Sequence, residues 1–244
     1  MEPYYSENGI TIFHGDCLEV ADGLESDSVN LILTDPPYSS GTRREGAKGV
    51  RKSMNRETAD DAWFGTDCLT TNGFLWLMRG CAREWRRLLK PHSHILSFID
   101  WRMNPALAGA IETADLRQSG VVVWDKMMIG MGACFRNQHE FILHFTYGVG
   151  REPFRRDCPN VLRYPAIRGG LHDCEKPVDL LSKLIEVTTD AGETVCDFFA
   201  GSGSTLVAAK AVGRCAIGIE SEERYCEIAA NRLRQGVLFG SEVA

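Results

Sequence analysis

The run Thr34-Asp35-Pro36-Pro37-Tyr38 carries the most specific chemistry in the chain, and it follows the apolar segment Val29–Leu33. Two consecutive prolines remove two N–H donors, so carbonyl oxygens and the Asp35 carboxylate remain as hydrogen-bond acceptors. Such a corner suits an NH2 group, and Tyr38 offers a flat face on which a base can stack. A rigid turn is the alternative, but ligands of open α/β sheets bind beyond the carboxyl ends of strands. We therefore expect catalytic roles for Asp35, Pro36, Pro37 and Tyr38.

The run from Asp197 to Thr205, Asp-Phe-Phe-Ala-Gly-Ser-Gly-Ser-Thr, is the second candidate site. A strand ends there, glycines allow close backbone approach and a helix begins, which is a general arrangement for a nucleotide-like ligand. Leu206 stands where a dinucleotide fingerprint has its third glycine, so the ligand need not carry a pyrophosphate. The candidate cofactor-binding residues in this run are Asp197, Phe198, Phe199, Gly201, Ser202, Gly203, Ser204 and Thr205.

Three charged side chains elsewhere fit such a ligand. Glu220 ends an apolar run seventeen positions after Gly203, where a carboxylate can accept hydrogen bonds from two ribose hydroxyls. Asp16 either caps the next helix or accepts a hydrogen bond from an adenine amine. Lys176 either is an ordinary surface lysine or faces the ligand from the start of a helix. The neighbouring residues Cys17 and Ser221, together with Asp35, complete the predicted cofactor-binding set.

The charge distribution leaves room for a nucleic-acid partner. The formal net charge is −6, but the segment from Arg43 to Arg56 holds six basic residues and one acid, and arginines cluster again in 151–168. Each cluster is either a phosphate-binding face or a solvated loop, and charge alone favours the loop. The predicted DNA-contacting residues in the first cluster are Arg43, Arg44, Lys48, Arg51, Lys52 and Arg56.

The elements that must position these residues are short apolar runs. Runs that are apolar throughout suit strands buried on both faces of a largely parallel sheet. Their alternation with helical patterns predicts a doubly wound α/β fold in one domain, 1–244. The predicted strands are Ile10–Phe13, Val29–Leu33, Ile95–Ile99, Val121–Trp124, Phe141–Phe145, Val195–Phe198 and Ala216–Ile219.

Four helices are predicted between those strands. They cover Phe74–Leu89, Pro177 to about Thr189, Ser204 or Thr205 towards Val212, and Arg224–Arg234. The stretch Ser39–Asp67 fits neither a helical nor a strand period, and its length suggests function or disorder.

Other classes of protein are disfavoured. The nine cysteines include no C-x-x-C pair and are odd in number, which predicts free thiols and no metal site. No apolar run is long enough to span a bilayer, and the start MEPYYSENG lacks the features of a signal peptide. We therefore expect a cytoplasmic protein.

In their residues and their order, these motifs resemble the amino-methyltransferases that act on DNA, in the β arrangement. The Asp35–Tyr38 run looks like the catalytic motif of that family, and Phe199-x-Gly201-x-Gly203 looks like its S-adenosylmethionine motif. Asp16 and Glu220 match the positions used for the adenine and ribose of that cofactor. Lys176-Pro177 matches the motif upstream of the glycine run, so Lys176 is expected at the cofactor's methionine end.

A segment later in the chain extends the resemblance. Phe135–Phe145 resembles the segment that flanks the target-base pocket, and its residues Arg136 and Asn137 join the predicted DNA contacts. Members often carry a sizeable recognition domain between the catalytic and cofactor halves, whereas this chain has only about 147–170 there. DNA reading is therefore expected to be minimal, or shared with an insertion at about 39–67 or with a second subunit in a homodimer.

The resemblance implies a Rossmann-like fold with a seven-stranded sheet, S-adenosylmethionine as cofactor and double-stranded DNA as substrate. It implies methylation of adenine N6 on a flipped base, within a restriction-modification context, and no metal. Cytosine N4 is the alternative target, although a serine in place of Asp35 is more usual there. A more distant target is an RNA or protein amide nitrogen, for which asparagine would be more typical. A non-catalytic DNA-binding subunit could keep the fold, whereas a nicotinamide-dependent oxidoreductase leaves the Asp35–Tyr38 run without a role.

Overall fold

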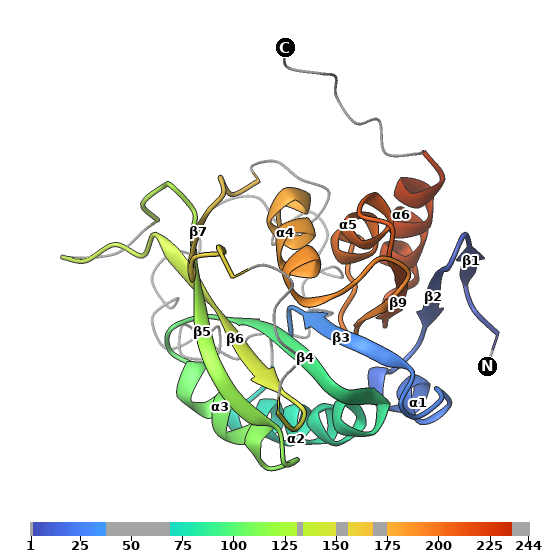
Figure 1. Cartoon of the computed structure of the whole chain (residues 1–244), viewed down its shortest axis with the longest axis horizontal. Helices are drawn as coiled ribbons and strands as arrows, with labels where there is room; N and C mark the ends of the chain where they lie inside the picture. Colours follow the sequence, from blue (N-terminus) through green and yellow to red (C-terminus); the bar gives the residue numbers. More distant parts are fainter. Residues whose placement is uncertain (1, 38–68, 131–133, 150–155, 168–174, 236–244) are drawn as a thin grey trace, which may run out of the picture.

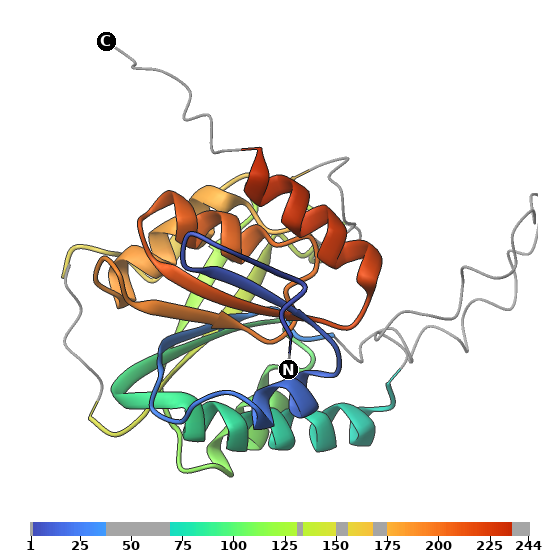
Figure 2. The same ribbon diagram turned by 90° about the vertical axis from the view of Figure 1, so that its right-hand side faces the viewer.

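The computed structural model describes residues 2–37, 69–130, 134–149, 156–167 and 175–235, which form three layers (Figure 1). A β-sheet lies between two groups of helices. One face carries α1 (Cys17–Asp22), α2 (Thr71–Leu88) and α3 (Asn104–Glu112). The other face carries α4 (Val178–Thr188), α5 (Ser204–Ala211) and α6 (Glu223–Arg234), as Figure 2 shows. The predicted α/β class is confirmed.

The sheet is mixed and, in the described residues, has nine strands in the order β1-β2-β9-β8-β3-β4-β6-β5-β7. Parallel pairing joins β2 to β9, β9 to β8, β8 to β3, β3 to β4 and β5 to β7. Antiparallel pairing joins β1 to β2 and β6 to both β4 and β5. The strands are β1 (Tyr5–Glu7), β2 (Ile10–His14), β3 (Val29–Thr34), β4 (Leu89–Ile99), β5 (Arg117–Asp125), β6 (His139–Thr146), β7 (Val161–Arg163), β8 (Thr194–Asp197) and β9 (Cys215–Glu220).

The expected number of seven strands is wrong for this sheet. All seven predicted apolar runs are strands, but β1 and β7 are added at its two edges. Each has three residues, and edge strands with polar outer positions produce no continuous apolar run. Helix α3 was also not predicted, and α1 was expected only as the helix that Asp16 could cap, without bounds. Helices α2, α4, α5 and α6 lie within a few residues of their predicted bounds.

Strand β3 shows why continuous apolar runs form the centre of the sheet. Every position from Val29 to Thr34 is buried. Ile32 faces the cluster under α1, α2 and α3, whereas Leu31 and Leu33 face the cluster under α4 and α5. A strand covered on both faces needs apolar side chains on both, which explains its unbroken run.

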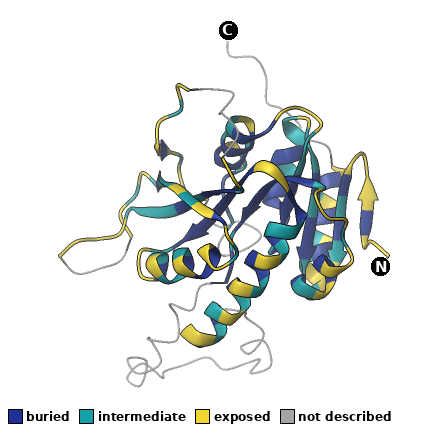
Figure 3. Cartoon of the chain, turned by 60° about the horizontal axis from the view of Figure 1, so that its bottom comes forward, coloured by how far each residue is buried: buried dark blue, intermediate teal, exposed yellow. Residues whose placement is uncertain are grey.

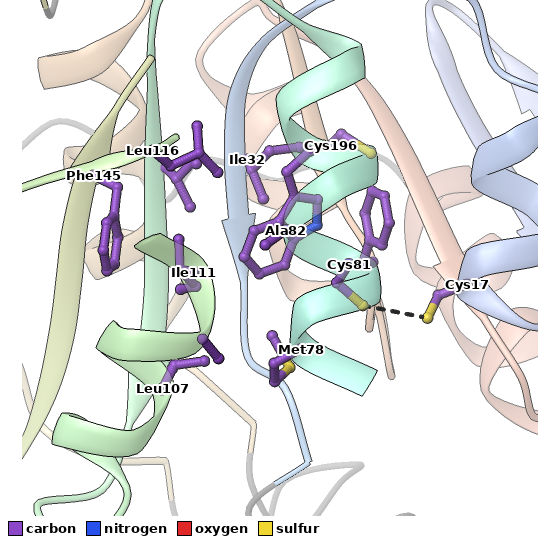
Figure 4. Close-up of a cluster of buried hydrophobic side chains, with 14 of the residues drawn as sticks. Cys17, Ile32, Met78, Cys81, Ala82, Leu107, Ile111, Leu116, Phe145 and Cys196 are labelled. Carbon is purple, nitrogen blue, oxygen red and sulfur yellow. Dashed lines mark hydrogen bonds between the residues drawn. The ribbon is translucent and has the colours of Figure 1, made fainter. Parts of the chain in front are cut away.

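Helix α2 packs against the sheet through one stripe. Its buried residues recur at helical spacing, and its N-terminal turns project beyond the sheet with exposed positions (Figure 3). Trp85 meets the ring of Phe198 edge-on, with centroids 5.9 Å apart. Figure 4 shows Cys81 of this helix facing Cys17 of α1, with 3.8 Å between the sulfur atoms.

Two further properties concern the described residues alone. None of their helices is long and apolar enough to cross a membrane. Seven cysteines lie among them as free thiols, and no group of three or more His, Cys, Asp or Glu residues there could hold a metal ion.

Candidate active site

The predicted motifs converge at one edge of the sheet. Strands β2, β9, β8 and β3 are parallel neighbours, so their carboxyl ends lie side by side (Figure 1). Glu220 is the last residue of β9, and Asp16, the glycine run and Asp35 come just beyond the ends of β2, β8 and β3. Thr34, which precedes Asp35, links the catalytic motif to the glycine run, because its hydroxyl donates to Asp197 Oδ1 at 2.7 Å. Thr34 and Asp197, more than 160 positions apart in the sequence, are thereby brought together. The predicted catalytic residue Tyr38 lies outside the described residues.

The glycine run opens its backbone towards unfilled space at one residue and packs tightly at another. Gly201 has φ +50°, and a Cβ added there would meet no atom of the described residues within 4 Å. Its N–H donates to Glu220 Oε2 at 2.8 Å, so the carboxylate holds the loop beside that space. A Cβ added at Gly203 (φ +82°) would lie 2.7 Å from Ala229 Cβ. A bare backbone with an adjacent carboxylate fits a nucleoside with ribose hydroxyls.

Most side chains of the run point inward and support the loop. Phe198 is a core residue, and Ser202, Ser204 and Thr205 are buried. Arg232 of α6 donates through Nη1 to the carbonyl oxygen of Ser202 at 2.8 Å, and to the hydroxyls of Ser202 and Ser204 at 3.0 and 3.1 Å. Its Nη2 pairs with Glu175 Oε1 at 2.8 Å. The loop is therefore tied to α6 and to the segment before α4.

Neither Arg232 nor Glu175 was singled out from the sequence. They lie far apart in the chain, and no spacing relates an arginine of the last helix to an acid before α4. Glu175 beside Lys176 was the only available signal.

The protonation of the buried Asp197 carboxyl makes the stability of the protein depend on pH. Burial raises the pKa of its carboxyl from 3.8 to about 6, although hydrogen bonds from Thr205, Thr34 and the Phe199 N–H lower it. The folded protein therefore holds this proton up to a higher pH than the unfolded chain. The resulting stabilisation is fully present below about pH 4 and is lost as the pH rises through 6.

The Asp197→Asn variant removes this titration. From pH 4 to pH 7, we expect its free energy of unfolding to rise relative to wild type by about 1–3 kcal/mol. Urea unfolding at a series of pH values measures the difference, in which titrations common to both proteins cancel. A difference that does not change with pH would contradict the expectation.

Asp35 lies at the end of a group of charged side chains. Lys176 Nζ forms an ion pair and hydrogen bond with Asp35 Oδ2, and lies 3.6 Å from Glu140 Oε2. Glu140 Oε1 accepts a hydrogen bond from Lys126 Nζ at 2.5 Å. Lys176 is only 7% exposed, with its Nζ 5.1 Å from the centre of the Phe98 ring, so it is not an ordinary surface lysine.

Glu140 is a largely buried charge, with 17% of its side chain exposed. Burial raises the pKa of its carboxyl, but Lys176 and Lys126 together lower it further, and the net direction is below its ordinary value. Glu140 is therefore ionised at neutral pH. In the part of the chain that the structure describes, its buried Oε2 has no hydrogen-bond partner and lies 3.6 Å from Lys176 Nζ.

Three further residues predicted to bind the cofactor differ in burial and in their hydrogen-bond partners. Asp16 caps α1, because its Oδ1 accepts from the N–H groups of Leu18 and Glu19 at 2.9 and 3.3 Å. Cys17 is buried in the core under α1 and α2. Ser221 is exposed, and its carbonyl oxygen lies 3.1 Å from His14 Nε2.

The predicted DNA contacts lie partly outside the described residues. This applies to all six basic residues between 43 and 56. Arg136 and Asn137 are exposed on the connection between β5 and β6, where Phe135 is 97% exposed. There, Arg136 Nε donates to the carbonyl oxygen of Gly130 at 2.6 Å.

A pocket of about 310 Å³ lies elsewhere, at the amino ends of β3 and β4. Its lining includes Asn30, Lys90, His92 and Thr188 and none of the predicted site residues. Strand direction places it at the opposite edge of the sheet from the motifs.

Comparisons with known proteins match most of the chain. The DNA methylase family matches residues 29–157 and 152–231. YubD of Escherichia coli (strain K12), a protein named as a methylase, is 33% identical over 219 residues, which cover 90% of this chain and 88% of YubD. The type II methyltransferase M.HinfI of Haemophilus influenzae is 28% identical over 252 residues, which cover 92% of this chain and 68% of that protein.

Solved structures share the fold. The complex of M1.HpyAVI with S-adenosylmethionine superposes with a TM-score of 0.65 at 24% identity, covering 91% of this chain and 99% of that one. The cytosine-N4-specific PvuII DNA methyltransferase superposes with a TM-score of 0.72 at 16% identity, covering 98% of this chain and 91% of that one.

Proposed function

The chain belongs to the DNA methylase family, and we propose that it transfers the methyl group of S-adenosylmethionine to N6 of adenine in double-stranded DNA. The observation that carries the proposal is the position of Asp35. Its carboxylate follows β3, paired with a buried lysine, at the sheet edge where Glu220 and the open backbone of Gly201 also lie. An aspartate at this position favours adenine over cytosine as the target.

Asp35 supplies the acceptor that the reaction requires. The adenine amine is a poor nucleophile because its lone pair is delocalised into the ring. Asp35 and the carbonyl of Pro36 would each accept one N–H, which aims the lone pair at the methyl carbon. S-adenosylmethionine supplies a methyl group already activated by its sulfonium, so orientation and electrostatics provide most of the catalysis.

Other residues would hold the cofactor. Glu220 and Asp16 are proposed to accept hydrogen bonds from the ribose hydroxyls and the adenine amine. The open backbone at Gly201 supports this because it leaves space beside Glu220. Lys176 was expected at the methionine end, and its ion pair with Asp35 supports a position between the cofactor and catalytic motifs.

The direct test is to incubate the purified protein with unmethylated genomic DNA and labelled S-adenosylmethionine, and to identify the labelled nucleoside. We expect label in N6-methyldeoxyadenosine, because Asp35 begins the catalytic motif. Label in N4-methyldeoxycytidine would contradict the proposed base and keep the chemistry. No label, with cofactor binding shown separately, would contradict catalysis and favour a DNA-binding subunit.

We also propose that DNA is read by the segments at about 39–67 and 147–170, together with Arg136 and Asn137. Because the second segment is short, we propose a homodimer. In it, one subunit contacts the DNA beside the base that the other subunit methylates. Sedimentation with and without a DNA duplex measures this assembly.

A further inference from the structure

Four alternating charges lead from the antiparallel side of the sheet to Asp35. Lys126 follows β5, Glu140 belongs to β6, Lys176 precedes α4 and Asp35 follows β3. One carboxylate oxygen of Glu140 binds Lys126 at 2.5 Å, and the other lies 3.6 Å from Lys176 Nζ, which pairs with Asp35. This line of charges (Lys126, Glu140, Lys176 and Asp35) therefore reaches the proposed catalytic carboxylate from β5 and β6. These two strands carry neither the catalytic motif nor the cofactor motif.

Apolar packing holds this line of charges in place. The register of β5 and β6 sets Glu140 opposite Trp124, and Lys126 Nζ lies 4.9 Å from the centre of the Trp124 ring. Phe98 meets Trp124 edge-on at 6.3 Å and lies 5.1 Å from Lys176 Nζ. These rings replace part of the water around the charges, so the charges interact more strongly than they would on the open surface.

We propose that Glu140 is a positioning residue that shares the charge of Lys176 with Asp35, so that Asp35 keeps its strength as an acceptor for the target amine. This inference rests on the proposed function. Asp35 and Glu140 together balance Lys176 and Lys126, so the line is neutral. Without Glu140, Lys176 would hold Asp35 more tightly and would present an uncompensated positive charge to the amine.

The sign of that charge matters for methyl transfer. The amine nitrogen forms a bond to the methyl carbon while the carbon–sulfur bond breaks, and sulfur takes that electron pair. Nitrogen bears a positive charge until one of its protons passes to Asp35. A net positive line beside this nitrogen opposes the transition state, whereas a neutral line does not.

Two single variants change the line in opposite directions. Glu140→Gln keeps the shape and removes a negative charge, which should lower the pKa of Asp35. Lys126→Met leaves Glu140 to interact with Lys176 alone, which should raise the pKa of Asp35. Asp197 also interacts electrostatically with Asp35, and both variants leave Asp197 unchanged.

The experiment measures the Asp35 carboxyl titration by 13C NMR, assigned with Asp35→Asn, and single-turnover methyl transfer at saturating cofactor across pH. In Glu140→Gln we expect a rate about tenfold to a hundredfold lower. The carboxyl midpoint and the acidic limb should move down by roughly half a pH unit or more. In Lys126→Met both should move up, and the double variant should return towards wild type.

Glu193→Gln is the matched control. It removes the same charge before β8, at the amino end of the sheet, where Glu193 accepts hydrogen bonds from Asn30 Nδ2 at 3.0 Å and Asp190 N at 2.8 Å. Its rate and midpoint should equal those of wild type.

A midpoint that rises in Glu140→Gln, or a rate that does not change, would overturn charge sharing. If wild-type protein methylates no DNA, the proposed function fails, and the NMR midpoints alone then decide the proposal. Cofactor binding by each variant, measured by calorimetry, separates a slower chemical step from a lost cofactor.

Discussion

The Asp35→Ala variant is expected to bind S-adenosylmethionine almost as wild type does and to transfer methyl groups at least about a thousandfold more slowly. The carboxylate is proposed to contact the target amine, whereas Gly201 and Glu220 form the proposed cofactor site on neighbouring strands. Removing Asp35 therefore removes an interaction that matters in the transition state and leaves the cofactor contacts in place. Single-turnover transfer and calorimetric cofactor binding measure the two properties separately.

Asp35→Asn refines the experiment, because asparagine keeps one acceptor oxygen and loses the charge. We expect its rate to lie between those of wild type and Asp35→Ala. Circular dichroism checks that each variant folds. An alanine variant that keeps most of the wild-type rate would remove Asp35 from the mechanism, and equal loss of cofactor binding would assign Asp35 to the cofactor site instead.

The second large effect is expected at Gly203. Its φ of +82° is in the left-handed region, and a Cβ there would lie 2.7 Å from Ala229 Cβ and 3.2 Å from Ala229 Cα. Gly203→Ala therefore combines backbone strain with a clash against α6 that no flexible side chain can relieve. We expect a loss of about 2–4 kcal/mol in the free energy of unfolding, together with weaker cofactor binding.

Gly213→Ala provides the matched comparison. Gly213 has φ +72°, but a Cβ there would meet no atom within 4 Å in the described part of the chain, so this variant carries strain without a clash. It should cost only about 1 kcal/mol and leave cofactor affinity unchanged. Urea unfolding of both variants isolates the contribution of close packing. Equal losses would show that Gly203 serves backbone conformation alone.

The sequence predicted the central elements well because their burial is visible in it. Strands such as β3 are covered on both faces, and a continuous apolar run follows from that burial. The sequence did not reveal β1 and β7, since three-residue edge strands owe their conformation to their neighbours. Helix α3, with the sequence NPALAGAIE, lacked the contrast between polar and apolar faces that identifies a helix.

In the candidate site, too, some features could be predicted from the sequence and others could not. Asp35, Glu220 and the glycine run could be predicted because each directly follows an apolar strand, and the carboxyl ends of parallel strands meet. The contact of Lys126 with Glu140 depends on how β5 and β6 pair, and that of Glu175 with Arg232 on how α6 packs. Such contacts depend on tertiary register, which local patterns do not contain.

The order of strands also has a consequence for synthesis of the protein. Strands β8 and β9 come late in the chain, yet they lie between β2 and β3 in the sheet. As the chain leaves the ribosome, β2 and β3 emerge before β8 and β9, so each of them has one unpaired edge until those two strands are made. The sheet therefore closes only after β8 and β9 have been synthesised, and until then the apolar β3 presents an unpaired edge that favours aggregation.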